Sequence, residues 1–146
     1  MSNKIYSTLV IVLALAGLLD AVYLSDMALT GSELTCTITG LDGCNVVAQS
    51  VYSQFLGIPL AVYGVIFYSL LLLAIIVSLY RVSAGMRRLV FSIALAGALF
   101  SSYFMYLQFF VIKALCIYCM GSAFVAYLLA ILTFLAIRTQ APPTPL

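Results

Sequence analysis

Charged residues and histidine are what this sequence most lacks. Only 7% of its 146 residues are charged and 66% are hydrophobic, whereas about 25% charged residues is usual in a soluble domain. A soluble fold could not bury this much apolar surface, so the composition predicts a protein that crosses the membrane several times. The absence of histidine removes the usual neutral-pH proton shuttle and argues against a metal site. No basic cluster is present, which argues against nucleic acid as a partner.

Four apolar runs are long enough to cross a bilayer, which takes about 20 residues. They cover about 5–29, 57–80, 88–111 and 114–137. The first run exceeds the apolar core of a signal peptide, so we expect an uncleaved span. Only Ile112–Lys113 separates the last two runs, which forces an antiparallel hairpin. The sequence therefore predicts an all-α membrane protein: one four-helix bundle, residues 1–138, with a Pro-rich tail at 139–146.

The basic residues predict the orientation of this bundle. One side receives Lys4, Arg81, Arg87, Arg88 and Arg138, and the other receives only Lys113. Because lysine and arginine gather on the cytoplasmic side of membrane proteins, we expect both termini and the 81–87 turn to be cytoplasmic. The long loop, residues 30–56, then faces the external or periplasmic side.

All four cysteines fall at this external level. Cys36 and Cys44 lie in the long loop, and Cys116 and Cys119 form Cys-Ile-Tyr-Cys where the last run begins. Disulfides persist outside the cytosol, and the free amides and dipole at a helix start favour the thiolate. We interpret the four as two redox pairs that exchange electrons, a flexible loop pair and a fixed pair. The alternative is that both pairs are static staples.

Residues 45–55 follow the second loop cysteine and carry an amphipathic pattern. Val47, Val51 and Phe55 recur at helical spacing, and polar residues fall away from them. This pattern is typical of a short helix lying in the membrane interface. We expect it to cover the mouth of the bundle as a lid.

The order and spacing of these motifs resemble the vitamin K epoxide reductase family, above all its prokaryotic homologues. The matching features are Cys36-x7-Cys44, Ser50, Phe55-Leu-Gly-Ile-Pro59, Gly64 and Cys116-Ile-Tyr-Cys119, and the resemblance covers residues 5–137. It implies a quinone-linked thiol oxidoreductase that forms disulfides in a thioredoxin-like dithiol protein. The acceptor would be menaquinone, ubiquinone or a related naphthoquinone. We expect a separate partner, because this chain carries no fused thioredoxin-like domain.

The resemblance also implies a role for each cysteine. Cys36 would exchange with the partner, Cys44 would relay electrons to Cys116, and Cys119 would face the quinone. Vertebrate members reduce vitamin K epoxide and place Asn and Tyr where this chain has Leu60 and Ala123. Neither of these side chains can form a hydrogen bond, so the sequence argues against epoxide as substrate, which stays an alternative.

Residues expected at the depth of Cys119 predict a quinone pocket, because an aromatic-rich cavity with few polar groups suits a flat apolar ligand. The predicted quinone-binding residues are Cys119, Ser50, Leu60, Tyr63, Phe67, Phe104, Gln108 and Ala123. Asp20 is an ionisable group at membrane depth, where insertion costs about 2.5–3.5 kcal/mol. It could deliver protons to the quinone; alternatively, it reaches the interface or bonds a neighbour.

Two further interpretations remain at this point. The DsbB-type quinone oxidoreductases also have four helices and two cysteine pairs, but their C-x-x-C comes in the first external loop, and here the order is reversed. The other is a structural membrane subunit whose disulfides lock its external face.

Overall fold

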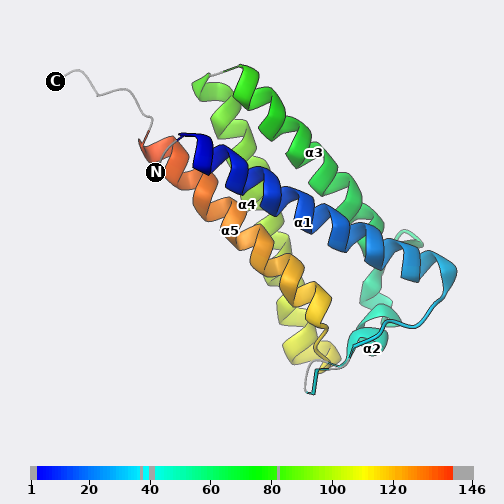
Figure 1. The fold of residues 1–146 in the computed structure, drawn as a ribbon. Helices are drawn as coiled ribbons and strands as arrows, with labels where there is room; N and C mark the ends of the chain where they lie inside the picture. The colour runs from blue at the N-terminus through cyan, green and yellow to red at the C-terminus, as the bar shows by residue number, and fades with distance from the viewer. Residues whose placement is uncertain (1–2, 37, 40–41, 82, 140–146) are drawn as a thin grey trace.

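The computed structural model describes residues 3–36, 38–39, 42–81 and 83–139, and it is a helical bundle (Figure 1). Its long helices are α1 (Asn3–Thr30), α3 (Leu60–Tyr80), α4 (Ala84–Tyr106) and α5 (Ile117–Thr139). Within the described ranges, four helical segments are long and apolar enough to cross a membrane. The predicted all-α, four-helix membrane fold is therefore confirmed.

The helices pack through small side chains. Helix α1 contacts α3 and α5, and α4 contacts α5 and α3. Alanines such as Ala14, Ala94 and Ala98 are buried between the helices, where they surround the larger Tyr68 and Leu129. Small residues allow helix backbones to approach closely, which is the usual source of packing energy within a membrane. The bundle is consequently held together without any large polar core.

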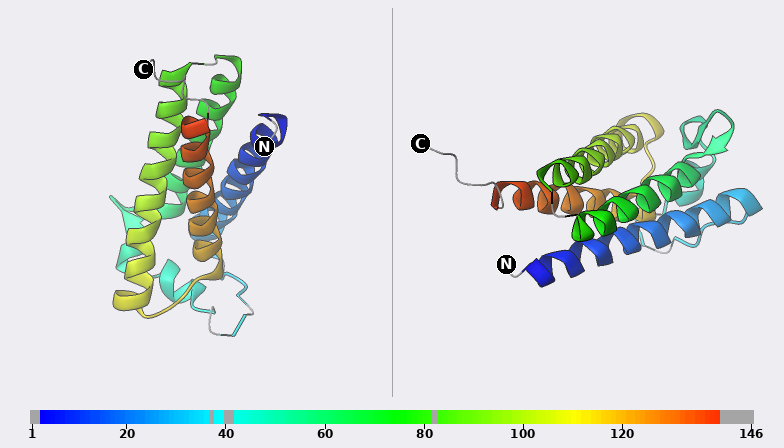
Figure 2. Two further views of the ribbon diagram at one scale, coloured as in Figure 1. Left: turned by 90° about the vertical axis from the view of Figure 1, so that its left-hand side faces the viewer. Right: turned by 90° about the horizontal axis from the view of Figure 1, so that it is seen from above.

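The two ends of the bundle differ in structure (Figures 1 and 2). At one end lie the start of α1, the end of α5 and the short link between α3 and α4. At the opposite end lie the loop after α1, the short helix α2 (Cys44–Ala48) and the link between α4 and α5. All four cysteines belong to this second end, which we call the loop end.

Helices α3, α4 and α5 begin at different residues from those predicted. Helix α3 begins at Leu60 rather than Gly57, because β1 (Gln54–Phe55) pairs with β2 (Ile58–Pro59) around a turn with positive φ at Leu56 and Gly57. Helix α4 begins at Ala84, after the Ser83 side chain accepts a hydrogen bond from the Met86 amide, which is the usual cap of a helix start.

The link before α5 is longer than the two residues predicted. Helix α4 continues as the π-helical segment η2 (Leu107–Ile112), and Lys113 then takes a left-handed conformation, with φ of 57°. Helix α5 begins only at Ile117. The predicted tail lies outside the described residues except for Thr139, which ends α5.

The predicted lid helix over residues 45–55 is broken into shorter pieces. Helix α2 ends at Ala48, and a 3-10 turn, η1 (Val51–Ser53), follows it. The Ser50 and Ser53 hydroxyls donate to backbone carbonyls at Val47, Ala48 and Ser50, and such bonds compete with helix formation.

Because of this break, the apolar stripe does not lie on one face. Val47 is 2% exposed, but Val51 is 84% and Phe55 is 59% exposed. Val47 packs into the bundle, whereas the exposed Phe55 contacts Tyr63 of α3.

Candidate redox active site

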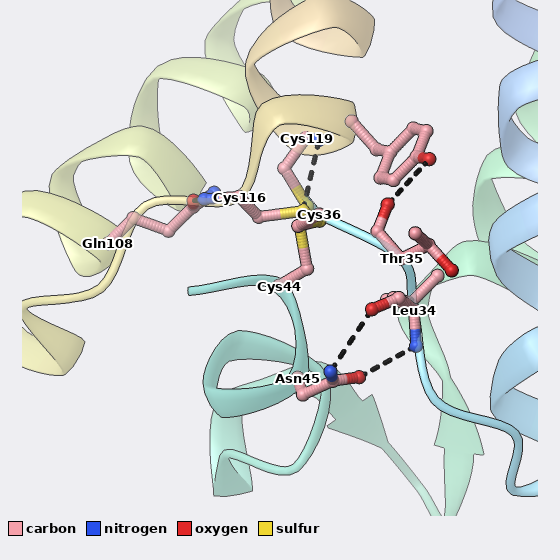
Figure 3. Close-up of a disulfide and its surroundings, with 9 residues drawn as sticks. Leu34, Thr35, Cys36, Cys44, Asn45, Gln108, Cys116 and Cys119 are labelled. Carbon is pink, nitrogen blue, oxygen red and sulfur yellow. Dashed lines mark hydrogen bonds between the residues drawn. A yellow bond between two sulfur atoms is a disulfide. The ribbon is translucent and has the colours of Figure 1, made fainter. Parts of the chain in front are cut away.

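The four cysteines meet at the loop end of the bundle. Cys36 and Cys44 form a disulfide with a Cα–Cα distance of 6.4 Å, while Cys116 and Cys119 are free thiols. All four belong to one apolar cluster, and Figure 3 shows their side chains converging. The molecule therefore holds one oxidised and one reduced pair side by side.

Specific hydrogen bonds hold the redox loop at both of its ends. The Asn45 side-chain amide accepts from the Leu34 amide at 2.8 Å and donates to the Leu34 carbonyl at 3.1 Å. The Tyr118 hydroxyl donates to the carbonyl of Thr35 at 3.1 Å. These bonds join the segment before Cys36 to α2 and to α5 (Figure 3).

Gly43 allows the loop to approach the start of α5. Asp42 and Cys116 form an isolated antiparallel bridge, and the Gly43 amide donates to the Leu115 carbonyl at 3.0 Å. A Cβ on Gly43 would lie 2.8 Å from the Ala114 Cβ and 2.9 Å from the Leu115 nitrogen. A larger residue would therefore push the Cys44 backbone away from Cys116.

Cys116 occupies the capping position of α5 rather than its first turn. Its carbonyl accepts from the Met120 amide, which is the first bond of the helix, and its sulfur accepts from the Cys119 amide at 3.4 Å. A side chain at this position normally satisfies one of the free amides of a helix start. Here the cap is a sulfur, and the positive end of the helix dipole favours its thiolate form.

Hydrogen bonds lower the pKa of Cys116. The main cause is a hydrogen bond from the Cys119 side chain, and the amides of Cys119 and Tyr118 act in the same direction. Burial and the charge of Asp20 oppose them, but the pKa still lies below that of an ordinary cysteine. Cys116 is thereby prepared to act as the nucleophile of its pair.

Gln108 supports Cys116 from behind. It lies in the π-helical segment η2, and its Oε1 accepts from the Cys116 amide at 2.9 Å. The residue is 0% exposed, and its Nε2 has no hydrogen-bond partner among the described residues. Gln108 thus fixes the backbone of Cys116, which differs from its predicted place in the quinone pocket.

A cavity of about 850 Å³ opens beside the cysteines, within the range of small-ligand sites. Cys44, Cys116 and Cys119 contribute to its lining, whereas Cys36 does not. It also contains six of the eight predicted quinone-binding residues: Cys119, Leu60, Tyr63, Phe67, Phe104 and Ala123. Ser50 and Gln108 are not part of the lining.

Tyr68 and Ser122 are polar residues of the cavity wall that were not predicted from the sequence. The Tyr68 hydroxyl donates to the Ser122 carbonyl at 3.0 Å and lies 3.1 Å from the Ser122 hydroxyl. Ser122 is three residues after Cys119, so helical spacing could have placed it on the same face. Tyr68 has no such signal, because its contact joins residues 54 apart.

Asp20 also lines the cavity, from the outer half of α1. Its Oδ2 is buried and has no hydrogen-bond partner in the part of the chain that the structure describes. The carboxyl group therefore neither bonds a described neighbour through this atom nor emerges at the surface there.

Comparison with known proteins gives this site a family. The chain matches the Vitamin K epoxide reductase family over residues 8–134, which is most of its length. The chain belongs to this family. With its four long apolar helices, this membership makes the chain a multi-pass membrane protein.

One curated relative is the thiol-disulfide oxidoreductase LTO1 of Arabidopsis thaliana. It is 32% identical over 131 residues, which cover 84% of this chain and 34% of the relative. The chain thus spans about a third of the length of this relative. The family match over residues 8–134 includes all four cysteines and most of the bundle.

Replacing Gly43 tests the close approach of the loop to α5. In a Cys36→Ser, Cys119→Ser background, oxidation should join Cys44 to Cys116, and mass spectrometry would measure the yield. We expect Gly43→Ala to lower this yield sharply, because overpacking costs about 1–3 kcal/mol. Gly85→Ala is the matched control, since no atom lies within 4 Å of its added Cβ. An unchanged yield in Gly43→Ala would contradict the proposed contact.

The lowered pKa of Cys116 predicts its reactivity with pH. Alkylation of Cys116 in the form with the loop disulfide intact should persist to lower pH than for an ordinary cysteine, because the thiolate is the reactive form. Cys119→Ala should move the midpoint upward by removing the main cause of the shift, while Cys119→Ser keeps a hydroxyl donor and should move it less. Peptide mass spectrometry reads the modification of Cys116. Identical midpoints in wild type and Cys119→Ala would exclude this explanation.

Proposed function

We propose that the protein oxidises the dithiol of a separate thioredoxin-like protein and passes the electrons to a membrane quinone. The observation that carries this proposal is the contact of a disulfide with a dithiol beside a large apolar cavity. Quinones are the general kind of redox partner in this family. The name of the Arabidopsis relative, a thiol-disulfide oxidoreductase, agrees with the thiol half of the reaction.

The burial of the cysteines supports an order for the electron transfer. Cys36 is half-buried and lies outside the cavity lining, whereas Cys44 and Cys116 are 0% and 1% exposed. The partner thiolate attacks Cys36 and releases Cys44 as a thiolate. Cys44 then attacks the Cys116–Cys119 disulfide at Cys116 and releases Cys119 toward the cavity. The partner's second thiolate attacks the partner sulfur of the mixed disulfide, which releases the oxidised partner and the Cys36 thiolate. Cys36 then attacks Cys44, which restores the loop disulfide and releases Cys116.

The electrons and protons balance over one cycle. The partner loses two electrons and two protons and gains a disulfide, and the quinone gains both and leaves as quinol. Each exchange step forms one S–S bond and breaks another. A potential difference of about 30 mV is worth about 1.4 kcal/mol for two electrons, so a quinone more oxidising than the partner dithiol drives the cycle. The described state, with the loop pair oxidised and the Cys116–Cys119 pair reduced, fits the moment before quinone reduction.

The cavity suits a quinone ring better than an epoxide that needs hydrogen-bond donors at fixed places. Leu60 and Ala123 are part of its wall and offer no such donor. Phe67 and Phe104 contribute flat apolar surface. This composition supports quinone reduction and gives no support to vitamin K epoxide as the substrate.

The distribution of charge supports an external redox site. Arg81, Arg87 and Arg138 lie at the end of the bundle away from the cysteines, while Lys113 is the basic residue of the loop end among the described residues. By the positive-inside rule the loop end faces the external or periplasmic side. A dithiol partner would then meet Cys36 outside the cytosol.

Turnover by the purified protein tests this function. With a reduced thioredoxin-like protein and a short-chain naphthoquinone, wild type should form quinol, and Cys119→Ala should show no turnover above background. Cys44→Ser should accumulate a mixed disulfide between Cys36 and the partner, because the resolving thiolate is missing. Ser102→Ala, which alters an exposed Ser102–Tyr127 hydrogen bond, should retain full activity. An inactive wild type, or full activity in Cys119→Ala, would refute the proposal, and the lack of any adduct would favour structural disulfides.

Cysteine labelling tests the orientation. In a cysteine-free background, Thr39→Cys in the redox loop should react with a membrane-impermeant maleimide on intact cells. Gly85→Cys, at the opposite end of the bundle, should react only after lysis. The reverse pattern would show that the redox site faces the cytoplasm.

A further inference from the structure

Asp20 is a half-buried acid of the cavity whose Oδ2 is buried. The acids among the described cavity-lining residues are Asp20 and Glu33, and Glu33 is exposed at the rim. Neither lysine nor arginine occurs among the described residues that line the cavity, so Asp20 has no cation there to balance its charge. An ionisable group at membrane depth is costly to insert, and a buried polar atom without a partner adds to that cost. This arrangement favours a ligand that forms a hydrogen bond with the Asp20 carboxyl group.

Several polar groups of the cavity already have partners. The Tyr68 hydroxyl is bonded to Ser122, and the Tyr63 hydroxyl donates to the Phe55 carbonyl at 3.1 Å. Leu60 and Ala123 cannot form hydrogen bonds. Asp20 Oδ2, by contrast, is a buried oxygen on the cavity wall with no partner among the described residues, so it is available to a ligand oxygen.

Asp20 shares its cavity with the reacting thiols, because Cys116 and Cys119 also line it. The thiols that lose protons and the acid that can hold one thus share a single apolar space. Such a space strengthens electrostatic interactions because water does not screen them.

We propose that the protonated Asp20 carboxyl hydrogen-bonds one carbonyl oxygen of the quinone and donates its proton to that oxygen as the quinone is reduced. This inference rests on the proposed function and names the group that completes its chemistry.

The protons of this step balance over the catalytic cycle. The Cys116–Cys119 dithiol loses two electrons and two protons as its S–S bond forms, and the two quinone oxygens each gain one proton. One proton reaches its oxygen through Asp20, which then recovers a proton released by the dithiol, and the second oxygen takes the other proton. Where Cys116 is already a thiolate, its share is the proton released when the partner dithiol was oxidised. Asp20 is unchanged over the cycle.

Two substitutions at Asp20 separate hydrogen bonding from proton transfer. Asp20→Asn keeps the size and a hydrogen-bond donor but cannot release a proton, so kcat should fall by about 10²-fold, the lower range for a lost general acid. Its KM for quinone should stay within about threefold of wild type, because the hydrogen bond survives. Asp20→Leu removes the donor too, so KM should also rise by about tenfold. Asp26→Asn, on an exposed acid of the same helix, should leave kcat and KM unchanged.

The readouts distinguish this inference from the proposed function. Turnover uses dithiothreitol as reductant and a short-chain naphthoquinone as acceptor. Calorimetry measures binding of the same quinone to Cys119→Ala with and without Asp20→Leu, and weaker binding in the double variant supports the contact. An inactive wild type overturns the function itself. An active wild type with unchanged kcat in both Asp20 variants overturns the role of Asp20 alone, as does an equal loss in the two variants with lowered thermal stability.

Discussion

The close approach of the backbone at Gly43 to the backbone before α5 is the contact on which the redox site depends. It brings the Cys36–Cys44 disulfide to Cys116 through one hydrogen bond and one isolated bridge. Glycine is required there by space rather than by backbone conformation, because its φ is −75° and its added Cβ would meet Ala114 and Leu115. Backbone contacts thus hold the loop beside the start of α5.

Several polar side chains at the loop end fix the backbone around the cysteines. Asn45 and Tyr118 hold the segment before Cys36, and Gln108 holds Cys116. In an apolar environment an unpaired polar group is costly, so a paired group gives a rigid local structure. Among the described residues, the buried polar atoms without a partner are Asp20 Oδ2, Ser25 Oγ and Gln108 Nε2, and of these residues Asp20 lies on the wall of the cavity.

The long elements were predictable from the sequence, and the short ones were not. Apolar runs locate the spanning helices, because the bilayer imposes their length. The prediction of one continuous lid helix was wrong because the Ser50 and Ser53 hydroxyls donate to nearby backbone carbonyls. Hydrophobic periodicity alone does not reveal such bonds. Six of the eight residues predicted from depth along the helices line the cavity, whereas Gln108 does not: from its π-helical segment, its side chain bonds the Cys116 amide.

The start of α5 explains why two cysteines three residues apart are chemically different. Spacing alone would place both sulfurs on one face of a first turn. Because α5 begins at Ile117, the residue after Cys116, Cys116 is the cap of the helix and its sulfur accepts from the Cys119 amide. Cys119 lies inside the first turn. The same amide bond that closes the helix therefore favours the thiolate on Cys116, next to the loop disulfide, and leaves Cys119 to face the cavity. The position of Cys116 just before α5 and of Cys119 inside it supports the direction proposed for electron flow.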